Sequence, residues 1–314
     1  MDPEILTTTV IPTVGRRELD RAVASVLEQS PPHPFEVIVV NDSGEPLPPA
    51  GWQADPRVRL LETDRLERCV ARNTGAAAAR GVYLHFLDDD DRMLPDGLRF
   101  LHEAAAGPAG GFLYGATRLE NRMGKRLLEL EHHLSGNIAA QVMCGEWIPL
   151  QSALIQKTLF FDLGGFHPWQ AGSEDIDLVR RAAVRTDFRY VPSPMSAVTM
   201  GAAGSTTLHD RQSVRSRRGR ELILDQPETF PRMLASADSP RWRGGIARIY
   251  LTSCLWNLAR RKLPTAARRL LFGLAILIRS GRQLFAGAFW SAILHPYRSV
   301  TFSRAAEHLP QAAG

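Results

Sequence analysis

The amino-acid sequence predicts an α/β fold with a mostly parallel central sheet flanked by helices and a helical extension at its C-terminal end. Over the first hundred residues, short apolar runs alternate with segments whose apolar residues recur at helical spacing. This alternation is typical of βαβ crossovers, which build parallel sheets. From about residue 241 onward, only the helical spacing remains.

The expected strands and helices follow one another along the chain. The run FEVIVVND over residues 35–42 is apolar and β-branched, as expected of a buried parallel strand. Pro95 is expected in the first turn of a helix, where a missing amide proton is tolerated. Residues 110–192 are expected to mix short strands with one helix near residues 176–185. The other expected strands cover residues 5–11, 57–62 and 82–88, and the other expected helices cover residues 17–29 and 68–81.

The composition is that of a globular protein. Of 314 residues, 44% are hydrophobic and 23% are charged. The three cysteines, Cys69, Cys144 and Cys254, are far apart and form no CxxC pair. This argues against a zinc site or a disulfide framework and favours a reducing cytosol. Because Asp2 and Glu4 stand where a signal peptide would be basic, we expect no N-terminal signal peptide.

Charge is distributed unevenly along the chain. Residues 1–240 hold 26 basic and 32 acidic residues, whereas residues 241–314 hold 12 basic residues and one acid, Glu307. A basic tail suggests an anionic partner, such as a membrane surface or a nucleic acid. The arginine-rich stretches lack a recognised nucleic-acid module and interleaved aromatic residues, which argues against nucleic acid.

The tail contains two apolar runs, over residues 270–278 and 284–294. Both are shorter than the roughly 20 residues that a transmembrane helix needs. The runs could be helices packed on the preceding domain, or a cationic segment at an anionic lipid surface with Phe289 and Trp290 at the boundary. Before them, Ala247 and Leu258 are expected on one apolar helical face, and Asn257 off it.

Four consecutive aspartates, at residues 88–91, end the expected strand over residues 82–88. They could form a solvated turn before the next helix, because carboxylates favour a helix N-terminus. They could also bind Mg²⁺ or Mn²⁺, which prefer oxygen ligands. Asn41 and Asp42 end another strand, and such strand ends meet in one ligand-binding crevice. This second polar cluster favours the metal interpretation, whereas the spacing excludes an EF-hand.

Glycine-patterned nucleotide motifs are absent from the sequence. Neither a Walker A sequence nor GxGxxG follows any expected strand, which argues against a P-loop enzyme and a standard dinucleotide enzyme. Asp42 could accept hydrogen bonds from a nucleoside, or simply close its strand with an Asx turn. Arg72 could reach a phosphate or be an ordinary surface arginine. Glu174 and Asp175 could be first-turn acids of a helix or supply a general base, and spacing alone leaves both open.

Together these segments resemble the inverting glycosyltransferases of family 2, which have the GT-A fold. The resemblance rests on TTTVIPTVGRRELDRAVASVLEQ, FEVIVVNDSGE, ARNTGAAAARGVYLHFLDDDD and GGFHPWQAGSEDIDLVRRA, which occur in the family's order over about residues 5–200. Val14 and Gly15 stand where the family usually has an aromatic residue and Asn, and Asn41 stands where an acid is frequent. These departures concern the donor base and leave the catalytic set intact.

The resemblance implies a role for each matching residue. Asp175 matches the catalytic base, with Glu174 beside it. Asp90 matches the metal ligand, with Asp88 as its partner, and His209 begins a segment that related enzymes close over the diphosphate and is counted with the metal site. The implied donor-binding residues are Thr9, Pro12, Thr13, Asp42, Arg72, Asp88 and Asp89, and the implied acceptor residues are Gly165, Phe166 and Trp169. Within the turn itself, Asp89 and Asp91 are expected to serve a structural role.

The resemblance also implies an activity. A sugar would pass from a nucleoside diphosphate sugar, with UDP the expected nucleotide, to a hydroxyl of a glycan or a lipid-linked acceptor. Mn²⁺ or Mg²⁺ would assist a single inverting displacement. The expected setting is polysaccharide or cell-envelope biosynthesis in the cytoplasm, peripheral to the inner face of the plasma membrane.

The chain is expected to divide into a GT-A catalytic domain over residues 1–240 and a basic helical extension over residues 241–314. Within the domain, the donor half covers about residues 1–110 and the acceptor half about residues 111–240. Two alternatives remain for the same fold. A non-catalytic nucleotide-sugar-binding or membrane scaffold protein is disfavoured by the intact Asp88, Asp90 and Asp175. A nucleotidyltransferase is disfavoured because its glycine-rich N-terminal loop is absent.

Overall fold

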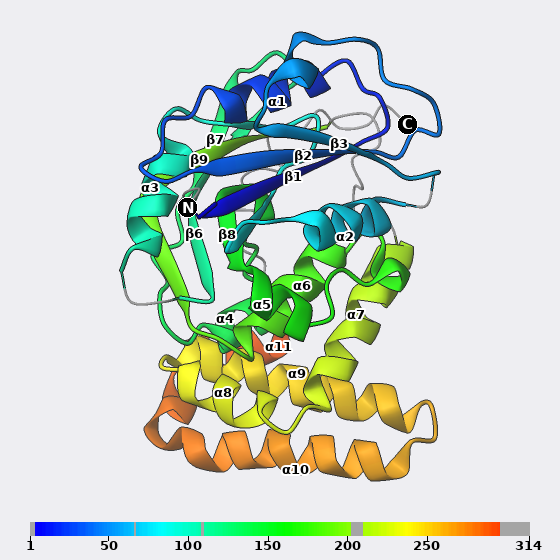
Figure 1. The fold of residues 1–314 in the computed structure, drawn as a ribbon. Helices are drawn as coiled ribbons and strands as arrows, with labels where there is room; N and C mark the ends of the chain where they lie inside the picture. The colour runs from blue at the N-terminus through cyan, green and yellow to red at the C-terminus, as the bar shows by residue number, and fades with distance from the viewer. Residues whose placement is uncertain (1–3, 66, 108–109, 202–209, 296–314) are drawn as a thin grey trace.

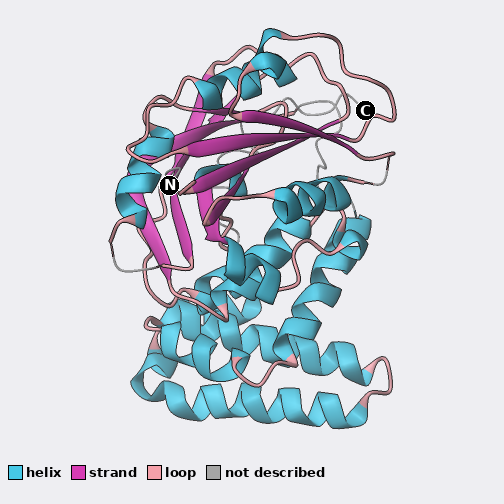
Figure 2. Cartoon of the chain, viewed as in Figure 1, coloured by secondary structure: helices cyan, strands magenta, loops and turns pink. Residues whose placement is uncertain are grey.

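The chain folds around one mixed sheet. The structure, a computed structural model, describes residues 4–65, 67–107, 110–201 and 210–295. Within these residues the sheet has nine strands, in the order β3-β2-β1-β4-β8-β6-β9-β5, with β7 paired to β6. Figure 1 shows helices on both sides of the sheet and a layer of C-terminal helices beneath it. Figure 2, which colours helices and strands differently, shows the strands gathered in the sheet and the C-terminal layer built of helices.

The N-terminal half of the sheet is parallel. β1 pairs in parallel with β2 and β4, and β2 pairs in parallel with β3. Every residue of β1 and β2 is buried, which explains why their sequences are continuous runs without polar alternation. The elements of this half are β1 (Thr7–Thr13), α1 (Leu19–Leu27), β2 (Phe35–Asn41), η1 (Gly51–Ala54), β3 (Val58–Glu62), α2 (Arg68–Ala78) and β4 (Tyr83–Phe86).

The second half introduces antiparallel pairs. β8 runs antiparallel to both β4 and β6, whereas β6 and β9 run parallel. β5 runs antiparallel to β9, and β7 to β6. The elements of this half are β5 (Arg92–Met93), α3 (Gly97–Ala105), β6 (Phe112–Glu120), β7 (Arg126–Leu130), α4 (Ala139–Cys144), η2 (Leu150–Ser152), β8 (Ala153–Gln156), α5 (Lys157–Asp162), η3 (Pro168–Gln170), α6 (Glu174–Ala183) and β9 (Phe188–Thr199).

Apolar side chains cover both faces of the sheet. On one face, α1 and α3 pack through residues such as Val23 and Leu98. On the other face, α2, α5 and α6 pack through residues such as Ala76, Phe160 and Leu178. This arrangement confirms the predicted α/β class. With both faces covered, ligands of such a sheet bind at the carboxyl ends of its strands.

Two helices begin at positions that differ from the sequence expectation. Asp96 precedes α3 in a left-handed conformation, with a φ of 63°, so the helix begins at Gly97 and Pro95 lies outside its first turn. α6 begins at Glu174, so Glu174 and Asp175 lie in its first turn. Carboxylates at this position interact favourably with the helix dipole.

The C-terminal helices share a core with the preceding domain. Ile246 and Tyr250 of α9 are buried in one cluster with Met143 of α4 and Ile223 of α7. The tail therefore packs on the rest of the chain, as one of the two sequence interpretations expected. These helices are α7 (Asp210–Leu224), α8 (Thr229–Ser236), α9 (Pro240–Leu258), α10 (Leu263–Ser280), η4 (Gly281–Phe285) and α11 (Gly287–Leu294).

The outer surface of these helices exposes large apolar side chains. Leu271 of α10 is 65% exposed and Ile278 is 81% exposed. Leu258 of α9 is also exposed, whereas Asn257 is buried, so the apolar face predicted for this helix is wrong at its C-terminal end. Among the described residues, no helix has both the length and the apolar character required to cross a membrane.

Arg269 is fully buried at the centre of the C-terminal layer. Its guanidinium group donates to the Leu224 carbonyl oxygen at 2.7 Å, to Asp225 Oδ1 at 2.7 Å and to Ser253 Oγ at 3.1 Å. One arginine of α10 thus joins the end of α7 to α9. Removal of the guanidinium group would leave several of these buried groups without their partner.

We expect Arg269→Ala to lower the free energy of unfolding by about 3 kcal/mol, because the Leu224 carbonyl oxygen and the buried Ser253 hydroxyl group lose their hydrogen-bond partner and the packing of a large buried side chain is lost. Arg268→Ala is the matched control. Arg268 also contacts Asp225, but its side chain is about half exposed, so its loss should cost less than about 1 kcal/mol. Urea denaturation followed by circular dichroism measures both values, and equal losses would contradict the role given to Arg269.

Candidate active site

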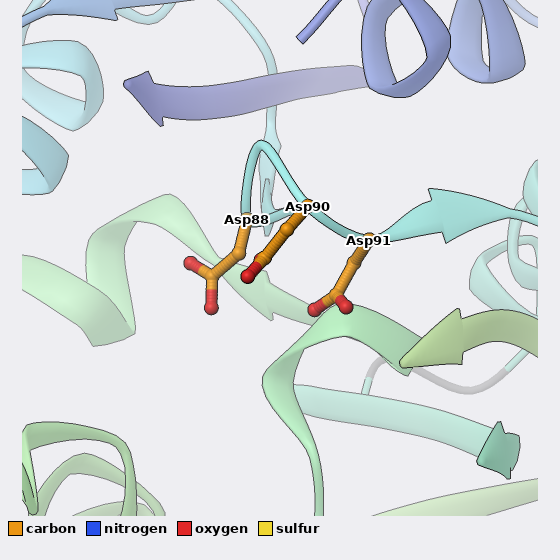
Figure 3. A group of neighbouring side chains, drawn as sticks. All are labelled: Asp88, Asp90 and Asp91. Atoms are coloured by element: carbon orange, nitrogen blue, oxygen red, sulfur yellow. The ribbon is translucent and has the colours of Figure 1, made fainter. Parts of the chain in front are cut away.

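The four aspartates form the loop between β4 and β5. Carboxylate oxygens of Asp88, Asp90 and Asp91 lie within 4.8 Å of one another. Figure 3 shows these three side chains pointing to the same side of the loop. Asp91 therefore joins the cluster, although the sequence assigned it only to the turn. Its amide also closes the turn by donating to the Asp88 carbonyl oxygen at 3.1 Å.

Burial and mutual repulsion raise the pKa of two of these carboxyl groups. Burial, followed by the charge of Asp88, raises the pKa of Asp90 to about 6. Burial also raises the pKa of Asp91 well above its ordinary value. Burial alone would raise the pKa of Asp88 as well, but the Arg72 guanidinium group outweighs it and lowers that pKa. Because a cation would relieve this repulsion, the cluster is compatible with a divalent metal ion.

Asp89 contacts the first strand and the loop after it. Thr13 Oγ1 donates to Asp89 Oδ2 at 2.6 Å, and Arg16 Nη1 donates to Asp89 Oδ1 at 2.9 Å. The same nitrogen of Arg16 donates to Asp90 Oδ2 at 3.1 Å. Thr13, which was predicted to bind the donor, therefore lies directly beside the aspartate loop.

The second half of the sheet fixes the other side of the loop. The Thr199 amide, at the end of β9, donates to Asp91 Oδ1 at 2.8 Å, and its hydroxyl donates to the Asp90 carbonyl oxygen at 2.8 Å. Gln151 Nε2, in η2, donates to Asp88 Oδ2 at 3.1 Å. The carboxylates are thus oriented from three different strands or their connections before any ligand binds.

Arg72 joins the aspartate loop to the start of α6. Its guanidinium group donates to Asp88 Oδ1 at 2.5 Å and to Glu174 Oε1 at 2.9 Å, and only 7% of its side chain is exposed. The ring of Phe166 lies 5.3 Å from the guanidinium carbon. Burial would lower the pKa of Arg72, but the two carboxylates raise it, so the bridge remains charged.

Asp175 lies next to this bridge, in the first turn of α6. Burial, followed by the Glu174 carboxylate, raises the pKa of Asp175 to about 6, although Arg72 opposes the shift. Within the described part of the chain, the one hydrogen bond to its carboxylate comes from the Ile176 amide, at 2.7 Å. A carboxylate with a raised pKa and no direct cationic partner is suited to accept a proton.

Two predicted donor-binding residues lie inside the sheet. Thr9 is fully buried, and its hydroxyl oxygen lies 3.1 Å from His85 Nδ1 in a shared hydrogen bond. Pro12 is likewise buried in β1. Both side chains therefore support the strand, and their contact with the donor stays a prediction.

Asp42 lies at the carboxyl end of β2, as predicted, and is held by its own neighbours. Thr63 Oγ1 donates to Asp42 Oδ1 at 2.7 Å, and the Glu67 amide donates to Asp42 Oδ2 at 3.0 Å. These contacts fix the carboxylate between the end of β3 and the start of α2. Both its structural role and its predicted nucleoside contact are compatible with this position.

The predicted acceptor loop is partly a core element. Phe166 is 1% exposed and packs against Phe86 and Phe160, so its side chain supports the loop, and its role toward an acceptor stays a prediction. Gly165 has a φ of +66°, and a Cβ atom there would lie 2.8 Å from Asn73 Oδ1. Glycine is therefore required at this position because any side chain would collide with α2.

Trp169 is the predicted acceptor residue that reaches the surface, with 39% of its surface exposed. Arg218 of α7 lies 5.5 Å from its ring, and Arg215 of the same helix donates to the Ala171 carbonyl oxygen at 2.7 Å. α7 therefore contacts the loop that leads into α6. His209, predicted beside the metal, lies outside the described residues.

A known family matches more than half of the chain. The sequence model of Glycosyl transferase family 2 matches residues 8–172, which include the aspartate loop, Arg72 and the loop that carries Trp169. The chain belongs to glycosyltransferase family 2. The candidate base Asp175 lies just beyond the matched region.

Several relatives of this family 2 member have been described. An uncharacterized protein of Mycobacterium tuberculosis is 29% identical over 208 residues, which cover 60% of this chain and 65% of the relative. The succinoglycan biosynthesis protein ExoO of Rhizobium meliloti is 44% identical over 88 residues, covering 27% and 25%. An uncharacterized glycosyltransferase of Haemophilus influenzae is 24% identical over 188 residues, covering 57% and 62%. Each match spans less than two thirds of the relative.

Solved structures share the fold of this family 2 member. TarS of S. aureus, residues 1–349 in complex with UDP-GlcNAc, has a TM-score of 0.59 and covers 89% of this chain and 92% of that chain. The same protein in complex with UDP has a TM-score of 0.58. The sequence identity is 13%, so the likeness establishes the GT-A fold alone.

Three residues of this family 2 site were not identified from the sequence. Arg16, Gln151 and Thr199 contact the aspartates across 73, 63 and 108 residues of chain. The spacing of residues within one segment does not indicate contacts between residues that lie so far apart in the sequence. Arg16 alone carried a weak signal, because it closely follows the first strand.

We expect Arg72→Gln to lower the free energy of unfolding of this family 2 member by about 3 kcal/mol, because Asp88 and Glu174 would lose a buried cation. Arg68→Gln is the control. Arg68 lies on the same helix at 3.8 Å from Glu174, and its side chain is 39% exposed, so the loss should stay below about 1 kcal/mol. Chemical denaturation measures the difference, and similar values for both variants would show that the bridge does not stabilise the fold.

Proposed function

We propose that this family 2 member is an inverting glycosyltransferase. It transfers a sugar from a nucleoside diphosphate sugar, with UDP the expected nucleotide, to a hydroxyl of a glycan or a lipid-linked acceptor. The observation that carries the proposal is the Arg72 bridge. By binding Asp88 and Glu174 together, it brings the first turn of α6, and with it Asp175, to the aspartate loop.

Asp175 acts as the general base in this proposal. Its carboxylate accepts the proton of the acceptor hydroxyl, whose oxygen attacks the anomeric carbon from the face opposite the leaving group. The bond to the diphosphate oxygen breaks as the new glycosidic bond forms, so the configuration inverts in one displacement. Glu174 holds Arg72 in place and is a positioning residue, because its carboxylate is occupied by Arg72 and by the Gly172 amide.

The aspartate loop holds a divalent cation, Mn²⁺ or Mg²⁺, in this proposal. The close spacing of the Asp88, Asp90 and Asp91 oxygens supports it, as does the raised pKa of Asp90. When bound, the ion offsets the negative charge that grows on the departing diphosphate. Asp90 is the expected principal ligand, while Arg72 keeps Asp88 ionised and Thr199 orients Asp91.

The donor is proposed to lie along the carboxyl ends of the first strands. In this proposal, Thr13 and the Asp89 carboxylate form one side of the donor-binding position, and Asp42 contacts the nucleoside. The shared fold with TarS, which was solved with UDP-GlcNAc and with UDP, supports a nucleotide sugar as donor.

The acceptor is proposed to approach the surface that Trp169 provides. The partial match to a succinoglycan biosynthesis protein supports a role in polysaccharide biosynthesis. The exposed apolar residues of α10 and the excess of basic residues after residue 240 support a peripheral location on an anionic membrane, on its cytoplasmic face. Residues 1–240 are proposed to be the catalytic domain and residues 241–314 its helical extension.

We expect Asp175→Asn to reduce kcat for sugar transfer by about a hundred- to ten-thousand-fold, because the general base is lost. Donor affinity should stay within about twofold, and stability should not fall. The folded pKa of about 6 lies above the ordinary value, so the ionised carboxylate is less stable in the folded than in the unfolded chain at pH 7, and its removal relieves that cost. Transfer assays measure kcat, and calorimetric titration measures donor affinity. A non-catalytic binding protein would show no transfer even in the native form.

Transfer by the native enzyme should decline as the pH falls through about 6, because protonated Asp175 cannot accept the acceptor proton. Donor affinity is measured at each pH, so that a loss of binding is separated from a loss of kcat. An unchanged kcat between pH 7.5 and 5 would exclude Asp175 as the base.

We expect Asp90→Asn to weaken Mn²⁺ binding by more than about tenfold, since it removes a charged oxygen ligand from the cluster. Asp89→Asn is the control, because Asp89 bonds Thr13 and Arg16 and lies outside the cluster. Isothermal calorimetry with Mn²⁺ alone measures both affinities. Equal affinities for the two variants would place the metal site elsewhere.

A further inference from the structure

A cavity lies among the C-terminal helices. It has a volume of about 480 Å³ and is bordered by residues of α7, α9 and α11, with Cys144 of α4. No lining residue belongs to the aspartate loop or to α6. A ligand here would therefore be distinct from the proposed donor and from the acid–base residues. The volume is within the range of small-molecule sites.

The lining of this cavity is strongly basic. Four arginines border it, and among the described residues no Asp or Glu does. They are Arg217 and Arg220 of α7, together with Arg241 and Arg248 of α9. Four guanidinium charges around one small volume repel one another and favour the entry of an anion.

Two of these arginines have structural contacts within the fold. Arg217 donates to the Thr252 carbonyl oxygen at 3.2 Å, and its guanidinium carbon lies 4.2 Å from the Trp256 ring centroid. Arg248 donates to the carbonyl oxygens of Ile293 and Leu294, at the end of α11. These contacts give both side chains a structural role that requires no ligand.

Arg220 has no such explanation. Its side chain makes no hydrogen bond with any described residue, and its Nε atom is buried without a partner. Burial lowers the pKa of Arg220, the Glu221 carboxylate opposes this only partly, and Arg217 and Arg248 lower the pKa further. The Glu221 carboxylate is occupied by Ser253 Oγ at 2.6 Å. A partly buried guanidinium group whose Nε atom has no partner is costly unless an anion satisfies it.

We propose that this cavity binds a phosphate group, as a phosphomonoester or a diphosphate. The flat fork of donors on a guanidinium group matches phosphate oxygens. A phosphomonoester carries a charge of about −1.5 to −2 at neutral pH, so it balances several arginines better than one carboxylate does. Arg220 is the central ligand, with Arg217 and Arg248 beside it.

The phosphate group could belong to a soluble molecule or to a lipid headgroup, which share this chemistry. The lipid source has local support, because Trp290 and Leu294 of α11 are exposed next to the cavity residues Ser291 and His295. Apolar side chains beside a phosphate site suit a lipid surface. The two sources can be separated by experiment.

The test uses the full chain in EDTA, so that metal at the aspartate loop does not contribute. Pyrophosphate and inorganic phosphate are titrated by thermal shift and calorimetry. The native chain should be stabilised in a saturable manner, because a ligand that binds the folded state raises Tm. Arg220→Gln should bind at least about tenfold more weakly, since it loses a charge-assisted bond.

Arg282→Gln is the matched control. It removes the same charge from the same layer of helices, but Arg282 is exposed and does not line the cavity. It should retain native affinity. Without ligand, Arg220→Gln should be as stable as the native chain or more stable, because it removes an unpaired buried charge. The stability measurement therefore distinguishes a loss of binding from a loss of folding.

The source is tested with vesicles of phosphatidylcholine, with and without phosphatidic acid, whose headgroup is a phosphomonoester. Sedimentation that requires phosphatidic acid and is lost in Arg220→Gln but kept in Arg282→Gln supports a lipid phosphate. A response to pyrophosphate without vesicle binding supports a soluble ligand. Equal binding by the native chain and Arg220→Gln would overturn the proposal, as would the absence of any response to phosphate, pyrophosphate and vesicles.

Discussion

The buried bridge of Arg72 is the interaction on which the site depends. Asp88 and Glu174 are separated by most of the sheet in sequence, and both carboxylates reach the same guanidinium group. Without this cation, several acids would meet in a region of low dielectric, where their repulsion would separate the aspartate loop from α6. Arg72 is itself fixed by the packing of α2 and by the ring of Phe166. The hydrophobic core therefore determines the geometry of the charged site through one side chain.

The four adjacent aspartates are distinguished by their partners. Asp88 bonds Arg72, Asp89 bonds Thr13, and Asp91 accepts from the Thr199 amide. Asp90 receives one hydrogen bond from Arg16, whose side chain is 30% exposed and is therefore easier to displace. A cation that approaches the cluster thus meets at Asp90 a carboxylate whose side-chain partner is easily displaced. The other three carboxylates are already held in position, so little ordering entropy is lost on binding.

Local features of the sequence predicted the fold well. Continuous apolar runs predicted β1 and β2 because both faces of these strands are buried, and the aspartates were placed correctly at a strand end. The sequence did not reveal Arg16, Gln151 or Thr199, whose contacts join distant segments. It also did not indicate that Phe166 is buried, because an aromatic residue in a glycine-rich loop is as compatible with a binding role as with a place in the core. Burial depends on the whole fold, and no spacing within a single segment determines it.

The net charge of the C-terminal segment is a further case in which sequence and structure carry different information. A count of arginines suggests a uniformly basic surface, yet Arg269 is fully buried in a hydrogen-bond network and Arg248 caps the end of α11. Arg269 is thus already compensated by a carbonyl oxygen and a carboxylate and attracts a partner only weakly. Arg220 of α7, which precedes this segment and borders the cavity beside Arg248, differs because its Nε atom has no partner among the described residues. The partner of a basic segment is therefore better inferred from the arginines that the fold leaves unsatisfied than from the net charge.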